Sequence, residues 1–281
     1  MPHALLFHGQ GGTDDVAAAL KAAKDGRIRR LVFAVPPGVS WPLPLYELAL
    51  LTAWRLQGDG ASGVTIAFVT PEHDPLDLFG PDAAARVRAL LEERGIDLRT
   101  GVRPVEAGGG RVALSDGPCL PADCTITVPC LEGRGILGLP RDSHGFIPVD
   151  AHGRVRGVDD VYAVGDTANF PVKQGGLATQ QADAAAEAIA ARLGSPRSPR
   201  PFRPVLRAVL LTGSAPLHLR ASLHDDGTRP EVAERALWWP PDKIAGRYLS
   251  PYLARLERPP PYPSALKDVR IPRSLARDRG R

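Results

Sequence analysis

Hydrophobic and polar positions alternate along the first two hundred residues in two distinct patterns. Short continuous apolar runs are typical of strands buried on both faces of a sheet. These runs lie at residues 29–35, 64–69 and 96–98. Stretches with helical spacing of apolar side chains lie between them. They cover residues 16–24, 43–54 and 81–94. Strands and helices in alternation predict an α/β fold.

The order is strand–helix–strand–helix–strand, with successive strands roughly 30 residues apart. This order is typical of a mononucleotide-binding half of a Rossmann-type parallel sheet. The pattern beyond residue 100 is more varied, and it predicts a hairpin, two further strands, a short excursion of β structure and one long helix. The hairpin is expected at residues 102–114, the two strands at residues 125–128 and 160–164, the β excursion at residues 145–155 and the helix at residues 177–193. The long helix opens at a pair of glycines and is rich in alanine, which favours helix most among the residues.

Charge divides the chain unevenly. The whole chain carries a net charge of +4, but residues 192–281 hold 18 Lys+Arg against 8 Asp+Glu. Proline also clusters where this basic part begins, at residues 195–204, and proline-rich segments form stiff connections. Such asymmetry indicates a separate C-terminal unit with its own surface chemistry.

Three cysteines, Cys119, Cys124 and Cys130, lie within a dozen residues. Their spacing of five and six fits neither a zinc site nor a CxxC redox pair. We therefore expect ordinary thiols packed in or beside strands and no metal site. The N-terminus has no basic segment leading into an apolar one, so the expected location is the cytoplasm.

The most informative segment is residues 160–182, which read DVYAVGDTANFPVKQGGLATQQA. It resembles the second FAD signature of flavoproteins with two dinucleotide-binding domains, a class that includes type II NADH dehydrogenases and sulfide:quinone oxidoreductases. In that class a hydrophobic strand ends in Gly-Asp, and a loop then leads into a helix. The segment GFIPVD at residues 145–150 matches what these enzymes place before the signature.

This resemblance implies an FAD site and the residues that form it. Asp166 would hold the ribityl chain, and Gly165 would let the backbone approach the cofactor closely; Thr167 completes this turn. The helix start would direct its positive end at the flavin ring, with backbone N–H groups of Leu177 and Ala178. The cofactor-binding residues implied at the helix start are Gly176, Leu177, Ala178 and Thr179. Taken alone, Gly-Asp is equally compatible with a simple strand-to-turn junction with an Asx cap.

The chain departs from this family at its beginning. Family members open with a strand and a Gly-x-Gly-x-x-Gly turn for the FAD pyrophosphate, and the cluster Gly9-Gln-Gly-Gly12 does not provide that unit. We therefore expect the first FAD half to be missing, so that FAD binding by this chain alone is not favoured. A second chain or another copy of this one would then complete the site.

A second departure concerns NAD(P). Aligning the helix that starts before Tyr46 with the family's glycine-rich turn places Ser40, Pro42 and Leu45 where three glycines belong. The sequence therefore disfavours an NAD(P) site. Glu72 follows the second strand, where a ribose-binding acid belongs, but its surroundings also read as a loop. The missing cysteine pair argues against sulfide as the electron donor.

Together these patterns define the expected fold class and its divisions. We expect an α/β fold with a degenerate, three-layer, Rossmann-like NAD(P)-binding-type domain at residues 1–106. The C-terminal half of an FAD-binding domain would follow at residues 107–194. Residues 195–281 would form an irregular basic tail rich in proline and arginine.

The tail mixes aromatic and cationic residues between Leu237 and Arg255. Such a stretch can rest at a lipid headgroup layer, which would place the protein at the inner membrane face. Trp238 and Trp239 could instead pack on the main body while the cations stay solvated. No nucleic-acid-binding motif accompanies the charge, so a nucleic-acid partner is not expected. The last dozen residues are expected to be disordered.

Two interpretations of function follow. In the first, the chain belongs to an FAD-dependent oxidoreductase that passes electrons from an unidentified small-molecule donor to an acceptor such as a quinone. In the second, it is a non-catalytic Rossmann-like remnant that acts as a subunit or interaction module.

Overall fold

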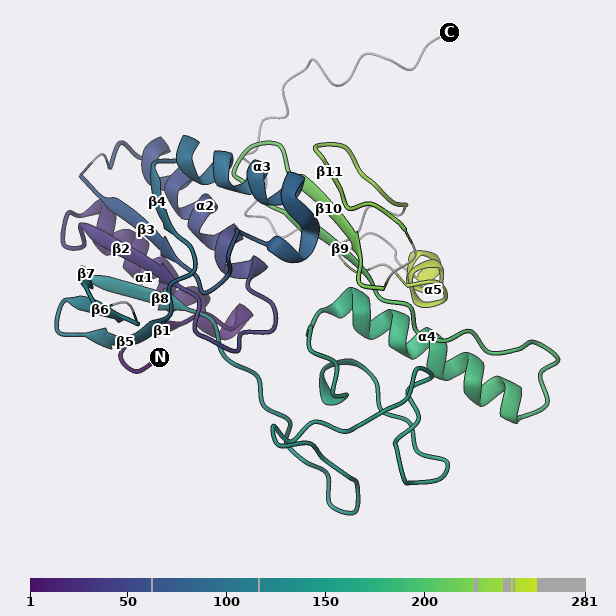
Figure 1. Cartoon of the computed structure of the whole chain (residues 1–281). Coiled ribbons are helices and arrows are strands. Elements are labelled where there is room, and N and C mark those ends of the chain that lie inside the picture. The colour runs from purple at the N-terminus through teal and green to yellow at the C-terminus, as the bar shows by residue number, and fades with distance from the viewer. Residues whose placement is uncertain (62, 116, 225–226, 240–243, 245, 257–281) are drawn as a thin grey trace, which may run out of the picture.

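The computed structural model describes residues 1–61, 63–115, 117–224, 227–239, 244 and 246–256. Its N-terminal part is a layered α/β unit, and a long connection leads from it to a second region built around one long helix (Figure 1). The expected strands and helices of the first hundred residues all form, with ends shifted by a few positions. The final dozen residues, for which disorder was expected, lie outside the described residues.

The central sheet of the first unit has five parallel strands in the order β1-β8-β2-β3-β4. Their bounds are Leu5–Leu6 for β1, Cys124–Thr127 for β8, Arg30–Ala34 for β2, Thr65–Val69 for β3 and Ile96–Arg99 for β4. The connecting helices are α1 (Thr13–Lys24), α2 (Leu43–Gly58) and α3 (Gly80–Glu93). Strand β8, which lies beyond the expected domain boundary at residue 106, pairs with β1 and β2 in this sheet. The expected domain divisions stay predictions.

Alternating side chains of β2 and β3 face two different layers. Leu31, Phe33, Ile66 and Phe68 pack in one core with residues of the three helices. Val32, Ala34, Ala67 and Val69 pack in another, against a small antiparallel sheet of order β5-β6-β7. That sheet comprises β5 (Pro104–Gly108), β6 (Arg111–Leu114) and β7 (Cys119–Pro121). The expected hairpin thus gains a third strand, and the three-layer Rossmann-like fold class is confirmed.

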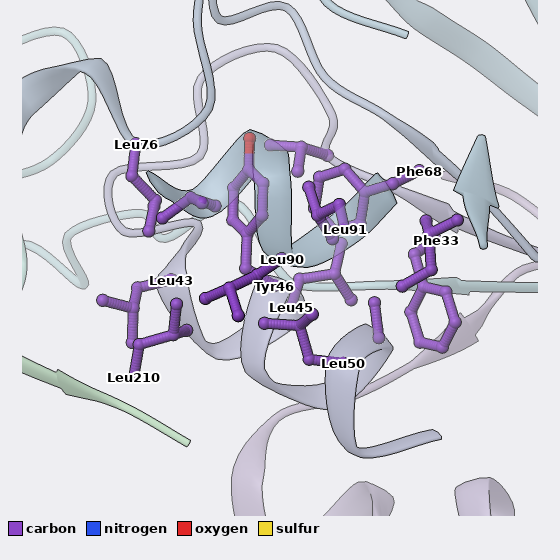
Figure 2. Close-up of a cluster of buried hydrophobic side chains, with 14 of the residues drawn as sticks. Phe33, Leu43, Leu45, Tyr46, Leu50, Phe68, Leu76, Leu90, Leu91 and Leu210 are labelled. Carbon is purple, nitrogen blue, oxygen red and sulfur yellow. The ribbon is translucent and has the colours of Figure 1, made fainter. Parts of the chain in front are cut away.

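The helical face of the sheet carries the largest buried side chains. Leu45, Tyr46, Phe33 and Phe68 are fully buried there, and the Tyr46 and Phe68 rings stack with centroids 4.1 Å apart (Figure 2). Burial of one such side chain stabilises a fold by about 1.5–3 kcal/mol. The start of α2 is therefore a packed element of the core.

One expected strand does not form. Residues 160–164 make a single isolated bridge, between Tyr162 and Arg154, and Asp160 has the left-handed backbone angle φ of 61°. The backbone of this segment pairs with residues 153–155 through two hydrogen bonds, from the N–H of Val155 to the carbonyl of Val161 and from the N–H of Ala163 to the carbonyl of Gly153. This pairing is too short to form a regular strand. The expected β excursion is likewise reduced to isolated bridges, such as Val149 with Val155.

The expected irregular tail contains regular structure. An antiparallel sheet of order β11-β10-β9 uses β9 (Val205–Leu210), β10 (Leu217–Ser222) and β11 (Glu231–Ala233). Apolar side chains of β9 and β10, among them Leu206 and Leu219, join the core of the first unit. Proline and arginine at the entry to this region hid its alternating apolar positions.

The second region is organised by α4 (Gly175–Arg192), the long alanine-rich helix expected from the sequence. A short helix, α5 (Leu249–Leu256), lies beside it (Figure 1). Among the described helices, none combines the length and the apolar composition that crossing a bilayer requires.

Candidate functional site

The turn at residues 165–167 lies against the first turns of α4. The turn is a short 3-10 helix, η3 (Gly165–Thr167), and the N–H of Gly165 donates a hydrogen bond of 2.6 Å to Oε1 of Gln181. Gly165 has a φ of 70°, and a Cβ atom there would lie 3.3 Å from Cβ of Ala178. Glycine therefore provides both the backbone angle and the close approach to the helix. The structure thus brings together the two halves of the site expected from the sequence.

Within this site the polar residues of the turn face solvent and the helix residues are mostly covered. Asp166 and Thr167 are exposed. Leu177 and Thr179 are buried, and the Thr179 hydroxyl donates to the carbonyl of Gly176 at 2.9 Å. A solvent-facing carboxylate can accept hydrogen bonds from the hydroxyls of a bound polyol. The turn therefore has the chemistry that a ribityl chain requires.

The helix start differs from its expected form. Gln174 is the N-cap of α4, and its Oε1 accepts from the N–H of Leu177 at 2.9 Å. The carbonyl of Gln174 accepts from the N–H groups of Leu177 and Ala178 at 3.0 Å each. The two N–H groups assigned by resemblance to the flavin ring are thus already bonded within the chain. The Gln174 carboxamide also donates through Nε2 to the carbonyl of Arg207 at 3.0 Å, so the cap is tied to β9 as well.

Lys173 lies next to this cap and is buried, with 7% of its surface exposed. Its ammonium group donates to the carbonyl of Ala168 and lies 3.7 Å from the centre of the Phe146 ring. Burial lowers the pKa of Lys173, and the carboxylates of Asp166 and Asp142 oppose that shift. A buried cation that interacts with the Asp166 carboxylate is therefore part of the site.

Glu72 lies away from η3, after β3, and its carboxylate has partners of its own. Oε2 accepts from the Tyr46 hydroxyl at 2.6 Å and from the Thr70 hydroxyl at 2.7 Å. Burial raises the pKa of Glu72, against the hydrogen bonds from Tyr46 and Thr70 that lower it. The pKa of Tyr46 is raised well above its usual value, by burial and by the neighbouring Glu72 charge. The Glu72 carboxylate, which was expected to bind a ribose, is thus hydrogen-bonded to Tyr46 at the start of α2 and to Thr70.

The start of α2 also lacks the donors that bind a pyrophosphate. The N-cap is Pro42, and Pro44 is the second residue of the helix, so neither position has an N–H. The N–H of Leu45 is bonded to the carbonyl of Pro42 at 2.9 Å. A dinucleotide rests on free N–H groups at a helix N-terminus. The two prolines and the bonded N–H of Leu45 thus leave fewer free N–H groups at this helix start than a pyrophosphate usually contacts.

Replacing Glu72 with glutamine should change how stability depends on pH. Because the folded-state pKa of Glu72 is raised above the unfolded value, its contribution to stability is fully present below the unfolded pKa. It is lost as pH rises through the folded pKa. Relative to E72Q, the native protein should lose stability as pH rises above about 4.5. Urea unfolding of both proteins at several pH values would test this, and a constant difference between them would contradict it.

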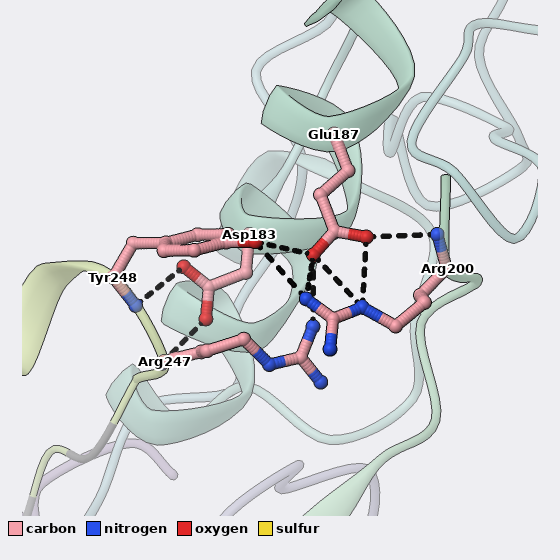
Figure 3. Close-up of polar contacts among 5 residues, drawn as sticks. All are labelled: Asp183, Glu187, Arg200, Arg247 and Tyr248. Carbon is pink, nitrogen blue, oxygen red and sulfur yellow. Dashed lines mark hydrogen bonds and ion pairs between the residues drawn. The ribbon is translucent and has the colours of Figure 1, made fainter. Parts of the chain in front are cut away.

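A polar cluster on α4 was not anticipated from the sequence. Oε1 of Glu187 accepts from Nη1 of Arg247 at 2.9 Å and from the Tyr248 hydroxyl at 2.7 Å, and both carboxylate oxygens accept from Arg200 (Figure 3). Hydrogen bonds from Arg200 hold the pKa of Glu187 well below its usual value. One helical turn earlier, Asp183 accepts from the backbone N–H groups of Arg247 and Tyr248 at 2.6 and 3.4 Å.

This cluster joins α4 to the segment that leads into α5. Asp183 and Glu187 are spaced i and i+4, which places both carboxylates on one face of the helix. Two acids on one face of an otherwise alanine-rich helix were the only signal in the sequence. Arg247 and Tyr248 lie some sixty residues away along the chain, and no local pattern relates them to the two acids.

The part of the chain that contains the Gly165–Asp166 turn matches a known protein family. Residues 52–189 match the family model described as pyridine nucleotide-disulphide oxidoreductase, a range that includes η3 and most of α4. An NADH dehydrogenase-like protein of Mycobacterium tuberculosis is 32% identical to this chain over 125 residues. The alignment covers 42% of this chain and 30% of that relative.

Two solved structures share the fold. The sulfide:quinone oxidoreductase of Aquifex aeolicus aligns with a TM-score of 0.72 and 18% identity, over 83% of this chain and 60% of that one. A NAD-dependent persulfide reductase from A. fulgidus aligns with a TM-score of 0.55 and 15% identity, over 80% of this chain and 41% of that one. The chain thus spans less than two thirds of each of these relatives. Together, the sequence match over residues 52–189 and the shared fold support a flavoprotein of the pyridine nucleotide-disulphide oxidoreductase type.

Proposed function

We propose that this chain is part of a flavin-dependent oxidoreductase that passes electrons from a small-molecule donor to an acceptor such as a quinone. The observation that carries the proposal is the contact between the Gly165–Asp166–Thr167 turn and the start of α4. This contact presents an exposed carboxylate beside a helix N-terminus, and the positive end of a helix favours the negative charge of a reduced flavin. A quinone is suggested as the electron acceptor because the structurally similar protein of Aquifex aeolicus is a sulfide:quinone oxidoreductase.

The roles of the residues follow from their geometry. Asp166 would accept hydrogen bonds from ribityl hydroxyls, and Gly165 would keep the backbone close enough for that contact. Lys173 would place a positive charge near the ring, held by the Ala168 carbonyl and the Phe146 ring. The flavin supplies the electron-transfer chemistry, and the protein supplies binding, orientation and charge.

The electron donor is proposed to be something other than NADH or NADPH. Two prolines at the start of α2 remove N–H groups from the expected pyrophosphate position, and Glu72 is bonded to Tyr46 and Thr70. The M. tuberculosis relative is named NADH dehydrogenase-like, so NADH is the ligand to compare. Calorimetric titration with NADH should give no binding heat, and a measurable affinity would contradict this part of the proposal.

Flavin binding can be tested with the two parts of the cofactor separately. Riboflavin carries the ribityl chain, whereas lumiflavin keeps the same isoalloxazine ring with a methyl group in place of that chain. Asp166→Asn should weaken riboflavin binding by about tenfold, as expected when a hydrogen bond to a charged group is lost, and should leave lumiflavin affinity unchanged. Asp159→Asn removes an exposed carboxylate outside the turn and serves as the matched control. Fluorescence quenching of each ligand gives the affinities.

The same titration decides between the two interpretations of the chain. If riboflavin or FAD binds to the native chain, as seen in the absorbance of the bound flavin, and binds more weakly to D166N, the oxidoreductase interpretation is supported. If neither ligand binds, the chain is better described as a non-catalytic subunit or interaction module. The bonds of Gln174 to the N–H groups of Leu177 and Ala178 are the observation that favours this second candidate.

A further inference from the structure

A cavity of about 630 Å³ lies beside α4, and the Gly165–Asp166 turn is not part of its lining. Its walls are the middle of α4 at residues 180–184, the connection at residues 200–203, and β9. Residues 238–239 and 246–247 complete the wall. Cavities of this size hold small organic ligands. The Gln180 side chain joins two of these walls, because it donates to and accepts from the backbone of Val205 at 2.9 and 3.0 Å.

The lining of this cavity has an excess of positive charge. Four arginines, Arg200, Arg203, Arg207 and Arg247, line it with a single acid, Asp183. Glu187 pairs with both Arg200 and Arg247, so one carboxylate serves two cations. Among the residues that the structure describes, no acidic side chain forms an ion pair with Arg203 or Arg207. Two cations of the lining are therefore without a counter-charge from this part of the chain.

Arg207 is the more informative of the two. Its Nε atom is buried and has no hydrogen-bond partner among the residues that the structure describes. Burial and the nearby Arg220 charge lower the pKa of Arg207, while Arg220 itself pairs with Glu231 at 2.7 Å. A buried guanidinium N–H left unpaired is costly. An anion in the cavity would supply the acceptor that Arg207 lacks.

Aromatic side chains provide the other half of the lining. Trp238 and Trp239 both face the cavity, and Trp239 is 88% exposed. The Trp238 ring meets the His218 ring edge to face, with centroids 5.5 Å apart. An exposed indole is a platform on which a flat ring can stack. Arginine and tryptophan together favour a ligand that is both planar and negatively charged.

We propose that this cavity binds a flat organic anion, an aromatic ring system that carries a carboxylate or a phosphate. Arg207 pairs with the anionic group, and the Trp238–Trp239 pair contacts the ring. The cavity borders the flavin-binding residues without including them in its lining. The Gln180 side chain donates to the Gly176 carbonyl at 2.9 Å, and the Gln174 side chain donates to the Arg207 carbonyl at 3.0 Å. The proposal does not depend on flavin binding, and each can fail without the other.

Isothermal titration of the purified chain tests the proposal with two matched pairs of ligands. 2-Naphthoate and AMP each carry a planar ring system and an anionic group, a carboxylate in the first and a phosphate in the second. 2-Naphthamide and adenosine are their uncharged counterparts. At least one anion should bind, and its uncharged counterpart should bind about tenfold more weakly, because a charge-assisted hydrogen bond is lost. The anion of the two that binds more tightly identifies the anionic group.

Arg207→Gln should weaken binding of that anion by about tenfold. Arg27→Gln removes an exposed arginine from the loop after α1 and should leave the affinity unchanged. Without ligand, R207Q should melt no lower than the native protein, because it removes an unpaired buried cation. If R207Q does not fold, Arg203→Gln on the exposed rim is the second variant, with an expected loss of about threefold.

Three results would overturn the proposal. The first is that neither 2-naphthoate nor AMP binds the native chain. The second is that the uncharged counterparts bind as tightly as the anions. The third is that a folded R207Q variant, or R203Q in its place, keeps the native affinity.

Discussion

Replacing Tyr46 with alanine should lower the free energy of unfolding by about 3–5 kcal/mol, the usual cost of truncating a fully buried aromatic side chain. Tyr46 is 0% exposed and stacks on Phe68 (Figure 2). Its hydroxyl is also one of two side-chain donors to the carboxylate of Glu72. The substitution therefore opens a cavity and removes a hydrogen bond from a partly buried charge. Chemical denaturation followed by circular dichroism measures the loss.

Tyr46→Phe separates these two effects. Phenylalanine keeps the ring stacked on Phe68 and removes only the hydroxyl, so its cost should be about 1–3 kcal/mol, that of one hydrogen bond to a charged group. Combining Y46F with Glu72→Gln should reduce that cost, because the neutral amide is less expensive to leave without a donor. Equal losses for Y46F and Y46A would show that the ring contributes nothing, and would refute the packing argument.

Asp183→Ala should have the second-largest effect, a loss of about 2–3 kcal/mol from the attachment of α5 to α4. Asp183 is 7% exposed, and its carboxylate accepts from the backbone N–H groups of Arg247 and Tyr248 (Figure 3). These N–H groups directly precede α5, where a carboxylate also meets the positive end of the helix. Alanine leaves both without their acceptor. Limited proteolysis should show faster cleavage of the C-terminal segment.

Asp183→Asn is the matched variant, because the amide oxygen can still accept from both N–H groups and only the charge is lost. Its effect should be less than half that of D183A. Glu93→Gln, at an exposed position near the end of α3, controls for loss of an acid from a helix surface. An unchanged proteolysis pattern in D183A would mean that the other contacts of α5, such as those of Glu187, are sufficient.

Most strands and helices of the first unit could be predicted from the local sequence pattern. The apolar runs that became β2, β3 and β4 were recognised because a strand covered on both faces is apolar throughout. The helices were recognised from spacing and from the proline or glycine at their ends. Strand β1, only two residues long, gave no such signal, and the strands β9 to β11 were hidden by the proline and arginine around them.

The candidate site shows the same division at the level of single residues. Sequence resemblance predicted that residues 165–167 and 176–179 belong to one site, and the structure brings them together. The bonds of Gln174 to the N–H groups of Leu177 and Ala178 were not foreseen. Neither was the engagement of Glu72 by Tyr46, because each depends on side-chain direction.

The sequence by itself determined the α/β class, the parallel order of the first strands, the long helix α4 and the Gly-Asp turn before it. All of these follow from periodicity or from residues adjacent along the chain. Only the tertiary structure decided that residues 160–164 form no regular strand. It also decided that Asp183 and Glu187 hold the segment before α5, and that Arg207 lines a cavity with no acidic ion-pair partner among the described residues. These features depend on contacts between residues tens of positions apart, and the free energy of such contacts is set by packing and burial that no local pattern encodes.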